Sequence, residues 1–124
     1  MTKILNVNTL GARFSGLHKI LERERPDYDI ITVRSKKQAL HEYPKHNSID
    51  LIIIGTNLGG TVRGWHLYDS LRDVGYEGPV LATTYGTRPR PKWEERSVPY
   101  ICSQASNKII LRKIDSIIKP ILPE

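Results

Sequence analysis

Five short apolar segments alternate with longer segments that have helical periodicity. The apolar segments cover residues 3–8, 28–33, 50–55, 79–85 and 99–103. The third of them, DLIIIG, is continuously apolar, which is typical of a strand buried on both faces of a parallel sheet. A parallel sheet of this kind needs helices on both faces, so the pattern predicts an α/β fold.

Helix boundary signals occur between the strand-like segments. Pro26 ends the first helical segment, and Ser35 followed by Gln38 fits a capping box at the start of the second. Gly75 is well placed to end a third helix that begins near residue 64. Ser106 is expected to cap the last helix, NKIILRKIDSII.

Strands and helices that alternate in this order predict a doubly wound sandwich, with right-handed crossovers and the flavodoxin-like strand order. The segment GTRPRPKWEERS, between the fourth and fifth strands, is irregular. Pro89 and Pro91 oppose a regular helix through its first half, although KWEERS could form a single turn. We find no linker and no repeat, and we expect residues 1–124 to form one domain.

Composition and charge limit the kind of protein. The chain has 124 residues, 39% of them hydrophobic, one cysteine, and no apolar run long enough to cross a bilayer. Its amino end does not resemble a secretory signal, so we expect a soluble cytoplasmic protein without membrane contact. The formal charge of +6 favours acidic partners, although such a charge is also ordinary for a small soluble domain.

The segment DLIIIGTNLGGTVRGWHLYDSLRD resembles the third strand, phosphorylation loop and third helix of response-regulator receiver domains, the CheY-like family of two-component signalling. PVLATTY resembles the fourth strand of that family, and the element order matches over nearly the whole chain. The resemblance implies a flavodoxin-like (CheY-like) sheet of five parallel strands. The chain between Thr84 and Ser103 is shorter than in the family, so helix four is expected to be shortened or missing.

The residues that carry receiver chemistry are replaced in this chain. Gly55 stands at the position of the phosphoacceptor aspartate, and Asn8 and Thr9 stand where receivers have an acidic pair for Mg²⁺. Ser103 stands where the family has the lysine that contacts the phosphoryl group. Neutral side chains hold Mg²⁺ poorly. The resemblance therefore implies a degenerate pseudo-receiver without a phosphoacceptor, and we expect neither a metal nor a cofactor.

Two other positions match the family. Thr84 corresponds to the hydroxyl residue of the fourth strand and Tyr100 to the aromatic residue of the fifth, the pair that in receivers couples phosphorylation to the surface of helix four, strand five and helix five. Thr and Tyr are also good strand residues in general. Together they favour an interaction surface that has been kept and remodelled.

Our first hypothesis is a non-catalytic, phosphorylation-independent regulatory domain that binds another protein in signalling or transcriptional control. The predicted binding surface is the loop after the fourth strand, where arginine and aromatic residues, types common at binding hot spots, are concentrated. A solvated loop is the simpler explanation, but Trp93, between prolines and basic residues, is expected to be exposed. The candidate residues are Tyr85, Arg88, Arg90, Lys92, Trp93, Arg96 and Tyr100.

Two alternatives remain open for the ligand, and a homodimer is a further possibility. The first is nucleic acid, because several cations could meet at one edge of the sheet, although no recognised nucleic-acid motif is present. These cations are Arg34, Lys36, Lys37, Arg63 and those of the loop. The second is a small anion or nucleotide, held by neutral hydrogen-bonding groups. That set is Asn8, Thr9, Thr56, Asn57 and Ser103.

An enzymatic function has the least support in the sequence. The glycines of GTNLGG fit neither a P-loop nor a dinucleotide-binding fingerprint. The four histidines are scattered, with no pair at metal-ligand spacing. We therefore predict that the protein is not an enzyme.

Overall fold

Five parallel strands form the sheet at the centre of the protein. The computed structural model describes residues 2–8, 17–86, 88–102 and 105–118. The strands are β1 (Lys3–Val7), β2 (Asp29–Val33), β3 (Leu51–Gly55), β4 (Val80–Thr84) and β5 (Tyr100–Cys102). They lie in the order β2-β1-β3-β4-β5, and every neighbouring pair is parallel. The predicted flavodoxin-like order is confirmed.

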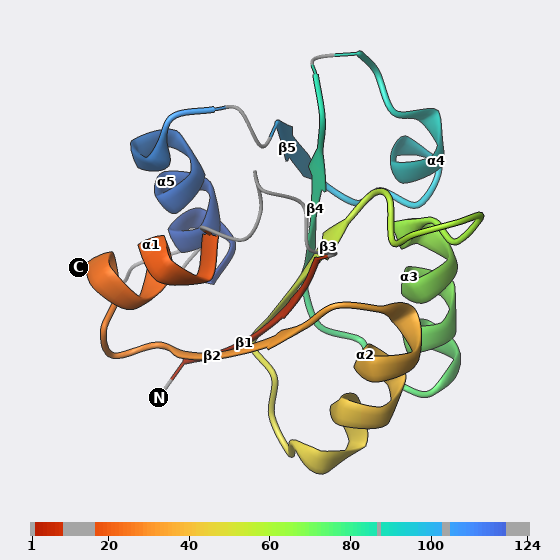
Figure 1. The fold of residues 1–124 in the computed structure, drawn as a ribbon, viewed down its shortest axis with the longest axis horizontal. Coiled ribbons are helices and arrows are strands. Elements are labelled where there is room, and N and C mark those ends of the chain that lie inside the picture. The colour runs from red at the N-terminus through yellow and green to blue at the C-terminus, as the bar shows by residue number, and fades with distance from the viewer. Residues whose placement is uncertain (1, 9–16, 87, 103–104, 119–124) are drawn as a thin grey trace.

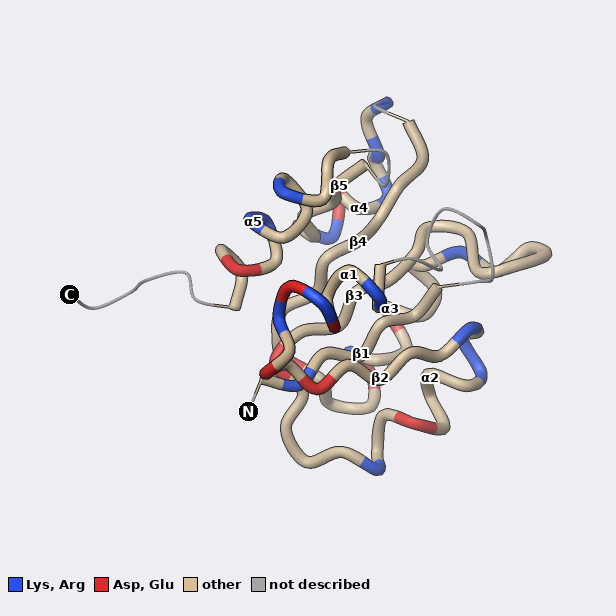
Figure 2. Tube along the Cα trace, turned by 60° about the vertical axis from the view of Figure 1, so that its left-hand side comes forward, with Lys and Arg blue, Asp and Glu red and all other residues tan. Residues whose placement is uncertain are grey.

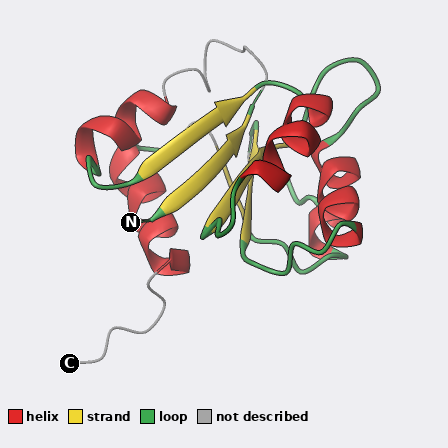
Figure 3. Cartoon of the chain, turned by 90° about the horizontal axis from the view of Figure 1, so that it is seen from below, coloured by secondary structure: helices red, strands yellow, loops and turns green. Residues whose placement is uncertain are grey.

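Helices cover both faces of this sheet. They are α1 (Leu17–Glu24), α2 (Lys36–Glu42), a short 3₁₀ turn η1 (Tyr43–Lys45), α3 (Gly64–Asp73), α4 (Pro91–Glu94) and α5 (Asn107–Ile118). Helices α1 and α5 lie on one side, whereas α2, α3 and α4 lie on the other (Figure 1). The two helical layers with the strands between them are clearest from below (Figure 3).

The local boundary signals act as the sequence predicts. The Ser35 hydroxyl accepts a hydrogen bond of 3.0 Å from the Gln38 N–H, and the Ser106 hydroxyl accepts one of 3.3 Å from the Ile109 N–H. Gly75, at φ 104°, takes the left-handed conformation after α3, which glycine adopts without a steric penalty.

Helix α4 is a single turn with Pro91 at its first position, as the shortened helix four predicted. Our expectation that Trp93 is exposed is wrong, because its side chain is 0% exposed. The indole packs edge-on against Trp65, at 5.9 Å between ring centroids, and against Tyr68, at 6.3 Å. A large aromatic ring that finds two such partners on α3 gains more from burial than from contact with solvent.

The sheet divides the hydrophobic core into two layers. One lies under α2, α3 and α4 and includes Trp93, whereas the other lies under α1 and α5. All five residues of β3 are buried, as the continuous apolar run predicts. None of the helices in the described residues is long and apolar enough to span a membrane.

Candidate functional site

The carboxyl ends of β1 and β3 meet at Asn8 and Gly55. The Asn8 N–H donates to the Val33 carbonyl at 3.0 Å, which continues the β1–β2 pairing and turns the Asn8 side chain inward to 5% exposure. A Cβ atom added to Gly55 would lie 2.6 Å from Asn8 Oδ1, far closer than real Cβ contacts. The Asn8 carboxamide therefore fills the space in which a side chain at position 55 would begin.

Hydrogen bonds hold this carboxamide in place. Asn8 Oδ1 accepts from the Thr83 hydroxyl at 3.4 Å, and Asn8 Nδ2 donates to Asn6 Oδ1. The Asn6 Nδ2 group is buried and has no hydrogen-bond partner among the described residues. These side chains are neutral and Gly55 has none, so the donor set does not fit Mg²⁺, which favours carboxylate oxygens.

Thr56, the first residue after β3, connects this site to α4. Its N–H and hydroxyl both donate to the Thr83 carbonyl, at 3.0 and 2.7 Å. The Thr56 hydroxyl in turn accepts a hydrogen bond of 3.0 Å from Trp93 Nε1. The indole is thus fixed by a polar contact at its edge as well as by its aromatic neighbours.

Gly64 allows α3 to begin close to β3 and α4. A Cβ atom on Gly64 would lie 2.3 Å from the Gly55 carbonyl oxygen and 2.8 Å from Trp93 Cζ2. The Gly64 N–H also donates to the Thr56 carbonyl at 2.7 Å. Only glycine permits this approach of backbone to backbone.

The pair Thr84 and Tyr100 is present, but each residue makes separate contacts. The buried Thr84 hydroxyl donates to the Ile101 carbonyl at 3.5 Å. The Tyr100 hydroxyl donates to Glu94 Oε2 at 2.8 Å and accepts from the Arg90 N–H at 3.3 Å. Tyr100 is therefore attached to α4.

Two cations of the predicted binding loop are engaged inside the fold. The Arg96 guanidinium donates two hydrogen bonds of 2.8 Å to the carboxylate of Asp69 on α3. This hydrogen-bonded ion pair holds the pKa of Asp69 below its ordinary value. The Arg90 guanidinium donates to the Tyr85 carbonyl, and its Nε is buried.

The exposed part of the predicted surface is smaller than the sequence suggests. Tyr85 is 56% exposed at the end of β4, and Arg88 and Lys92 are exposed beyond it. Neither Arg88 nor Lys92 has an ion-pair partner within the described part of the chain. Thr9 and Ser103, two further members of the predicted site, lie outside the described residues.

The remaining cations do not form a single stripe. Arg63 turns back onto its own loop, where it donates to the Gly60 carbonyl at 2.9 Å and to Asn57 Oδ1 at 3.3 Å. Arg34, Lys36 and Lys37 lie at the junction of β2 and α2, and strands β1 and β3 separate β2 from β4, the strand that precedes α4. Figure 2 shows lysine and arginine on several elements, with acidic residues between them.

The structure adds residues that the sequence did not single out. Asn6, Thr83 and Trp65 contact the site, and Asp69 holds Arg96. The polar residue inside the apolar run KILNVN was the only sequence signal for Asn6. Across the described ranges, no three His, Cys, Asp or Glu side chains come together in a group that could hold a metal ion.

Comparison with known proteins gives likeness at the level of fold. No protein-family model matches the sequence, and neither does any curated protein. Solved structures match closely. The N-terminal domain of a response regulator/sensory box/GGDEF 3-domain protein from Carboxydothermus hydrogenoformans aligns with a TM-score of 0.80 at 21% identity, over 96% of this chain and 95% of that one.

Two further structures agree with this match. A two-component response regulator from Clostridium difficile has a TM-score of 0.80 at 21% identity, over 96% of this chain and 97% of that one. A CheY-like response regulator receiver domain protein from Methanospirillum hungatei JF-1 has a TM-score of 0.80 at 16% identity, over 97% of this chain and 95% of that one. The chain has the flavodoxin-like fold of CheY-like receiver domains.

Proposed function

We propose that this protein is a receiver-like regulatory domain that acts by binding another protein and does not depend on phosphorylation. The proposal makes the domain a pseudo-receiver, which keeps the fold but not the chemistry of its structural neighbours. It also makes the protein non-catalytic. The observation that carries the proposal is the position of the Asn8 carboxamide beside Gly55.

Three features of the site support phosphorylation independence. Gly55 offers no nucleophile, and the space beside it holds Asn8 Oδ1. The neutral side chains of Asn8 and Thr9 stand where receivers have the carboxylates that hold a Mg²⁺ ion. Trp93 of α4 is buried and hydrogen-bonded to Thr56, so α4 is held in place without a phosphoryl group.

A phosphoryl-transfer assay tests this part of the proposal. The protein is incubated with acetyl phosphate and Mg²⁺, and its intact mass is measured. We expect no added phosphoryl group in the wild type, whereas a receiver domain with its aspartate serves as the positive control. A labile phosphoprotein that forms in the wild type would overturn the proposal.

The exposed residues after β4 support protein binding at that end of the molecule. Tyr85 offers an exposed aromatic ring, and Arg88 and Lys92 lie on the same connection between β4 and β5. Exposed aromatic and arginine side chains are frequent at binding hot spots.

Affinity capture from native lysate tests the protein partner. We expect a captured protein that survives nuclease and is lost with R88E/K92E but kept with R34E/K37E, which makes the same charge change at the β2–α2 junction. Phosphodonor and Mg²⁺ should not change the captured amount. Capture that nuclease abolishes would favour nucleic acid instead.

The small-anion alternative loses support from the hydrogen bonds of the site. The Thr56 hydroxyl both donates to Thr83 and accepts from Trp93, and Asn8 Oδ1 accepts from Thr83. Asn57 Oδ1 accepts from the Gly59 N–H at 3.1 Å. Two donors proposed to hold an anion, Asn8 Nδ2 and the Thr56 hydroxyl, thus donate within the protein, whereas Thr9 and Ser103 lie outside the described residues.

A further inference from the structure

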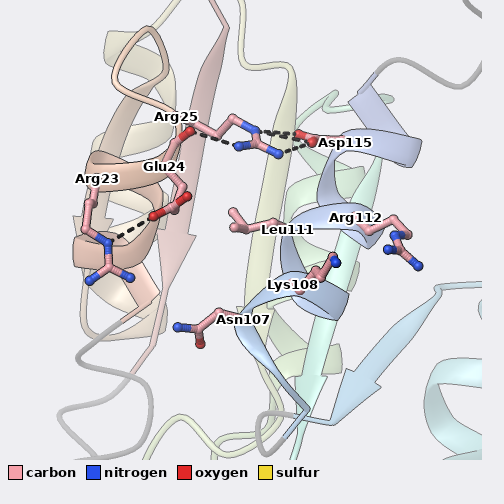
Figure 4. Close-up of a pocket in the computed structure, with 8 residues that line it drawn as sticks. All are labelled: Arg23, Glu24, Arg25, Asn107, Lys108, Leu111, Arg112 and Asp115. Atoms are coloured by element: carbon pink, nitrogen blue, oxygen red, sulfur yellow. Dashed lines mark hydrogen bonds and ion pairs between the residues drawn. The ribbon is translucent and has the colours of Figure 1, made fainter.

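A second surface with an excess of positive charge lies between α1 and α5, on the side of the sheet away from α4. A pocket of about 540 Å³ opens there. It is lined by Arg23, Glu24, Arg25, Asn107, Lys108, Leu111, Arg112 and Asp115. Figure 4 shows Leu111 and Asn107 pointing from α5 toward α1. Leu111 is 7% exposed and belongs to the hydrophobic core, so it forms the floor of the pocket.

An ion pair spans the two helices at one end of the pocket. The Arg25 guanidinium donates three hydrogen bonds to the Asp115 carboxylate (Figure 4). The Tyr28 hydroxyl donates to the same carboxylate at 3.1 Å. These contacts fasten the end of α1 to α5. They thereby hold α1 and α5 together at this end of the pocket.

Lys108 and Arg112 form no ion pair with any residue that the structure describes. Four cations and two carboxylates line the pocket, and Arg23 and Arg25 pair with Glu24 and Asp115. Within the described residues, neither Lys108 nor Arg112 has an ion-pair partner, and both are exposed.

Their placement is unfavourable for the isolated domain. Lys108 and Arg112 are one turn apart on α5 and repel each other, and Lys108 lies in the first turn, where no acidic residue offsets the positive end of the helix dipole. An anionic group bound between them would relieve both repulsions.

We infer that the α1–α5 pocket binds an acidic segment of a partner protein, with carboxylates on the exposed cations Lys108 and Arg112. Charge complementarity fixes the class of partner. A phosphate backbone is continuous and would also meet the Glu24 and Asp115 carboxylates in the same pocket, whereas a peptide places its acids one at a time. This inference rests on the proposed protein-binding function and names a second surface for it.

A binding assay with a defined probe tests the inference. The probe is a fluorescent amphipathic peptide of about twelve residues with Leu and Glu at helical spacing, and the matched probe replaces every Glu by Gln. We expect the acidic peptide alone to bind, and to bind more weakly when ionic strength rises from about 0.01 M to about 0.15 M. K108E/R112E should weaken binding at least about tenfold.

The control variant R34E/K37E makes the same charge change at two exposed cations near α2 and should leave the affinity within about twofold. Equal losses in both variants, or binding of the Gln peptide, would overturn the inference, as would absence of binding at about 1 mM peptide. If a single-stranded DNA displaces the peptide, and its binding requires Lys108 and Arg112, the inference that the partner is a protein would be overturned. These outcomes leave the phosphoryl-transfer and capture assays unaffected, so a failure here is distinguishable from a failure of the proposed function.

Discussion

At the scale of single residues, Gly55 and Asn8 depend on each other. The Asn8 carboxamide can occupy its buried position because residue 55 has no Cβ, which would lie 2.6 Å from Asn8 Oδ1. In turn, the carboxamide fills space that would otherwise be a void at the ends of β1 and β3. The lack of a side chain at position 55 is thus coupled to the packing of Asn8 and is not a feature of one position alone.

Gly55→Ala should therefore destabilise the protein. We expect a loss of about 1–3 kcal/mol in the free energy of unfolding, because the added methyl group forces the Asn8 side chain or the backbone to move. Urea denaturation measures the change. In a double-mutant cycle with Asn8→Ala, the two substitutions should couple by about 0.5–3 kcal/mol, since the smaller side chain makes room for the methyl group. Strictly additive effects would mean that the two residues do not compete for space.

At the scale of elements, α4 is too short to be stable by itself and depends on Trp93. A single turn gains little from its own hydrogen bonds, and in proteins helix stability comes mainly from packing. The buried indole supplies that packing through Trp65 and Tyr68 and is fixed by its bond to Thr56. Tyr100 adds a contact to α4 from β5 through Glu94.

Substitutions at Trp93 separate packing from hydrogen bonding. Trp93→Ala should cost about 3–5 kcal/mol of unfolding free energy because it leaves a large cavity. Trp93→Phe removes the indole N–H and with it the hydrogen bond to Thr56. This hydrogen bond should contribute about 1 kcal/mol to the free energy of unfolding, which a double-mutant cycle with Thr56→Val measures. Lys92→Ala, on the exposed side of the same turn, is the control and should change stability by less than about 0.5 kcal/mol. Equal effects of Lys92→Ala and Trp93→Ala would refute this account of α4.

The Asp69–Arg96 ion pair joins α3 to α4 and gives a stability that depends on pH. Arg96 lowers the pKa of Asp69 in the folded protein below its ordinary value of 3.8, so the pair stabilises the fold above that pH. The stabilisation is lost as pH falls through the lower folded pKa. Because the Asp69 side chain is half exposed, solvent screening limits the contribution to about 1 kcal/mol or less.

Asp69→Asn should accordingly destabilise the protein slightly at neutral pH and progressively less as the solution is acidified below the ordinary pKa of Asp69. Denaturation midpoints across an acid series measure this difference. The control is Asp73→Asn, on the same helix, where the aspartate is exposed and has no ion-pair partner in the described residues. A difference between wild type and Asp69→Asn that stays constant with pH would show that the ion pair is not its source.

The sequence predicts the elements well because their signals are local. Alternation of apolar runs, the serine caps at Ser35 and Ser106 and the glycine stop at Gly75 each act within a few residues, and the structure confirms them. Gly55 could also be singled out from the sequence, because the resemblance to receiver domains aligns it with the position of their phosphoacceptor aspartate. That residues 1–124 form one domain stays a prediction.

The candidate site was predicted less well because its contacts are distant in sequence. Whether Trp93 is exposed depends on the face that α3 presents to it, which the local run of prolines and basic residues does not reveal. Arg96 likewise looked available for a partner, but it pairs with Asp69, 27 residues away. The local sequence shows where charged residues occur, whereas tertiary contacts determine which of them are exposed.

At the scale of the whole molecule, the protein combines a receiver fold with two exposed cationic surfaces on opposite sides of its sheet. Arg88 and Lys92 lie by α4, and Lys108 and Arg112 lie on α5, so the two could contact different parts of one partner. We propose that binding at either surface does not require phosphorylation. The site beneath α4 is already filled by Asn8 and held by Trp93.

Heteronuclear NMR of the labelled protein titrated with beryllofluoride and Mg²⁺ tests this claim most directly. Beryllofluoride imitates a phosphoryl group on a carboxylate, and Mg²⁺ supplies the ion that such a site requires. We predict that the backbone resonances of β3, α4 and β5 do not shift, including those of Thr84 and Tyr100. Saturable shifts that spread from Gly55 to α4 and β5 would show that the site still binds a phosphoryl analogue, and would contradict the account.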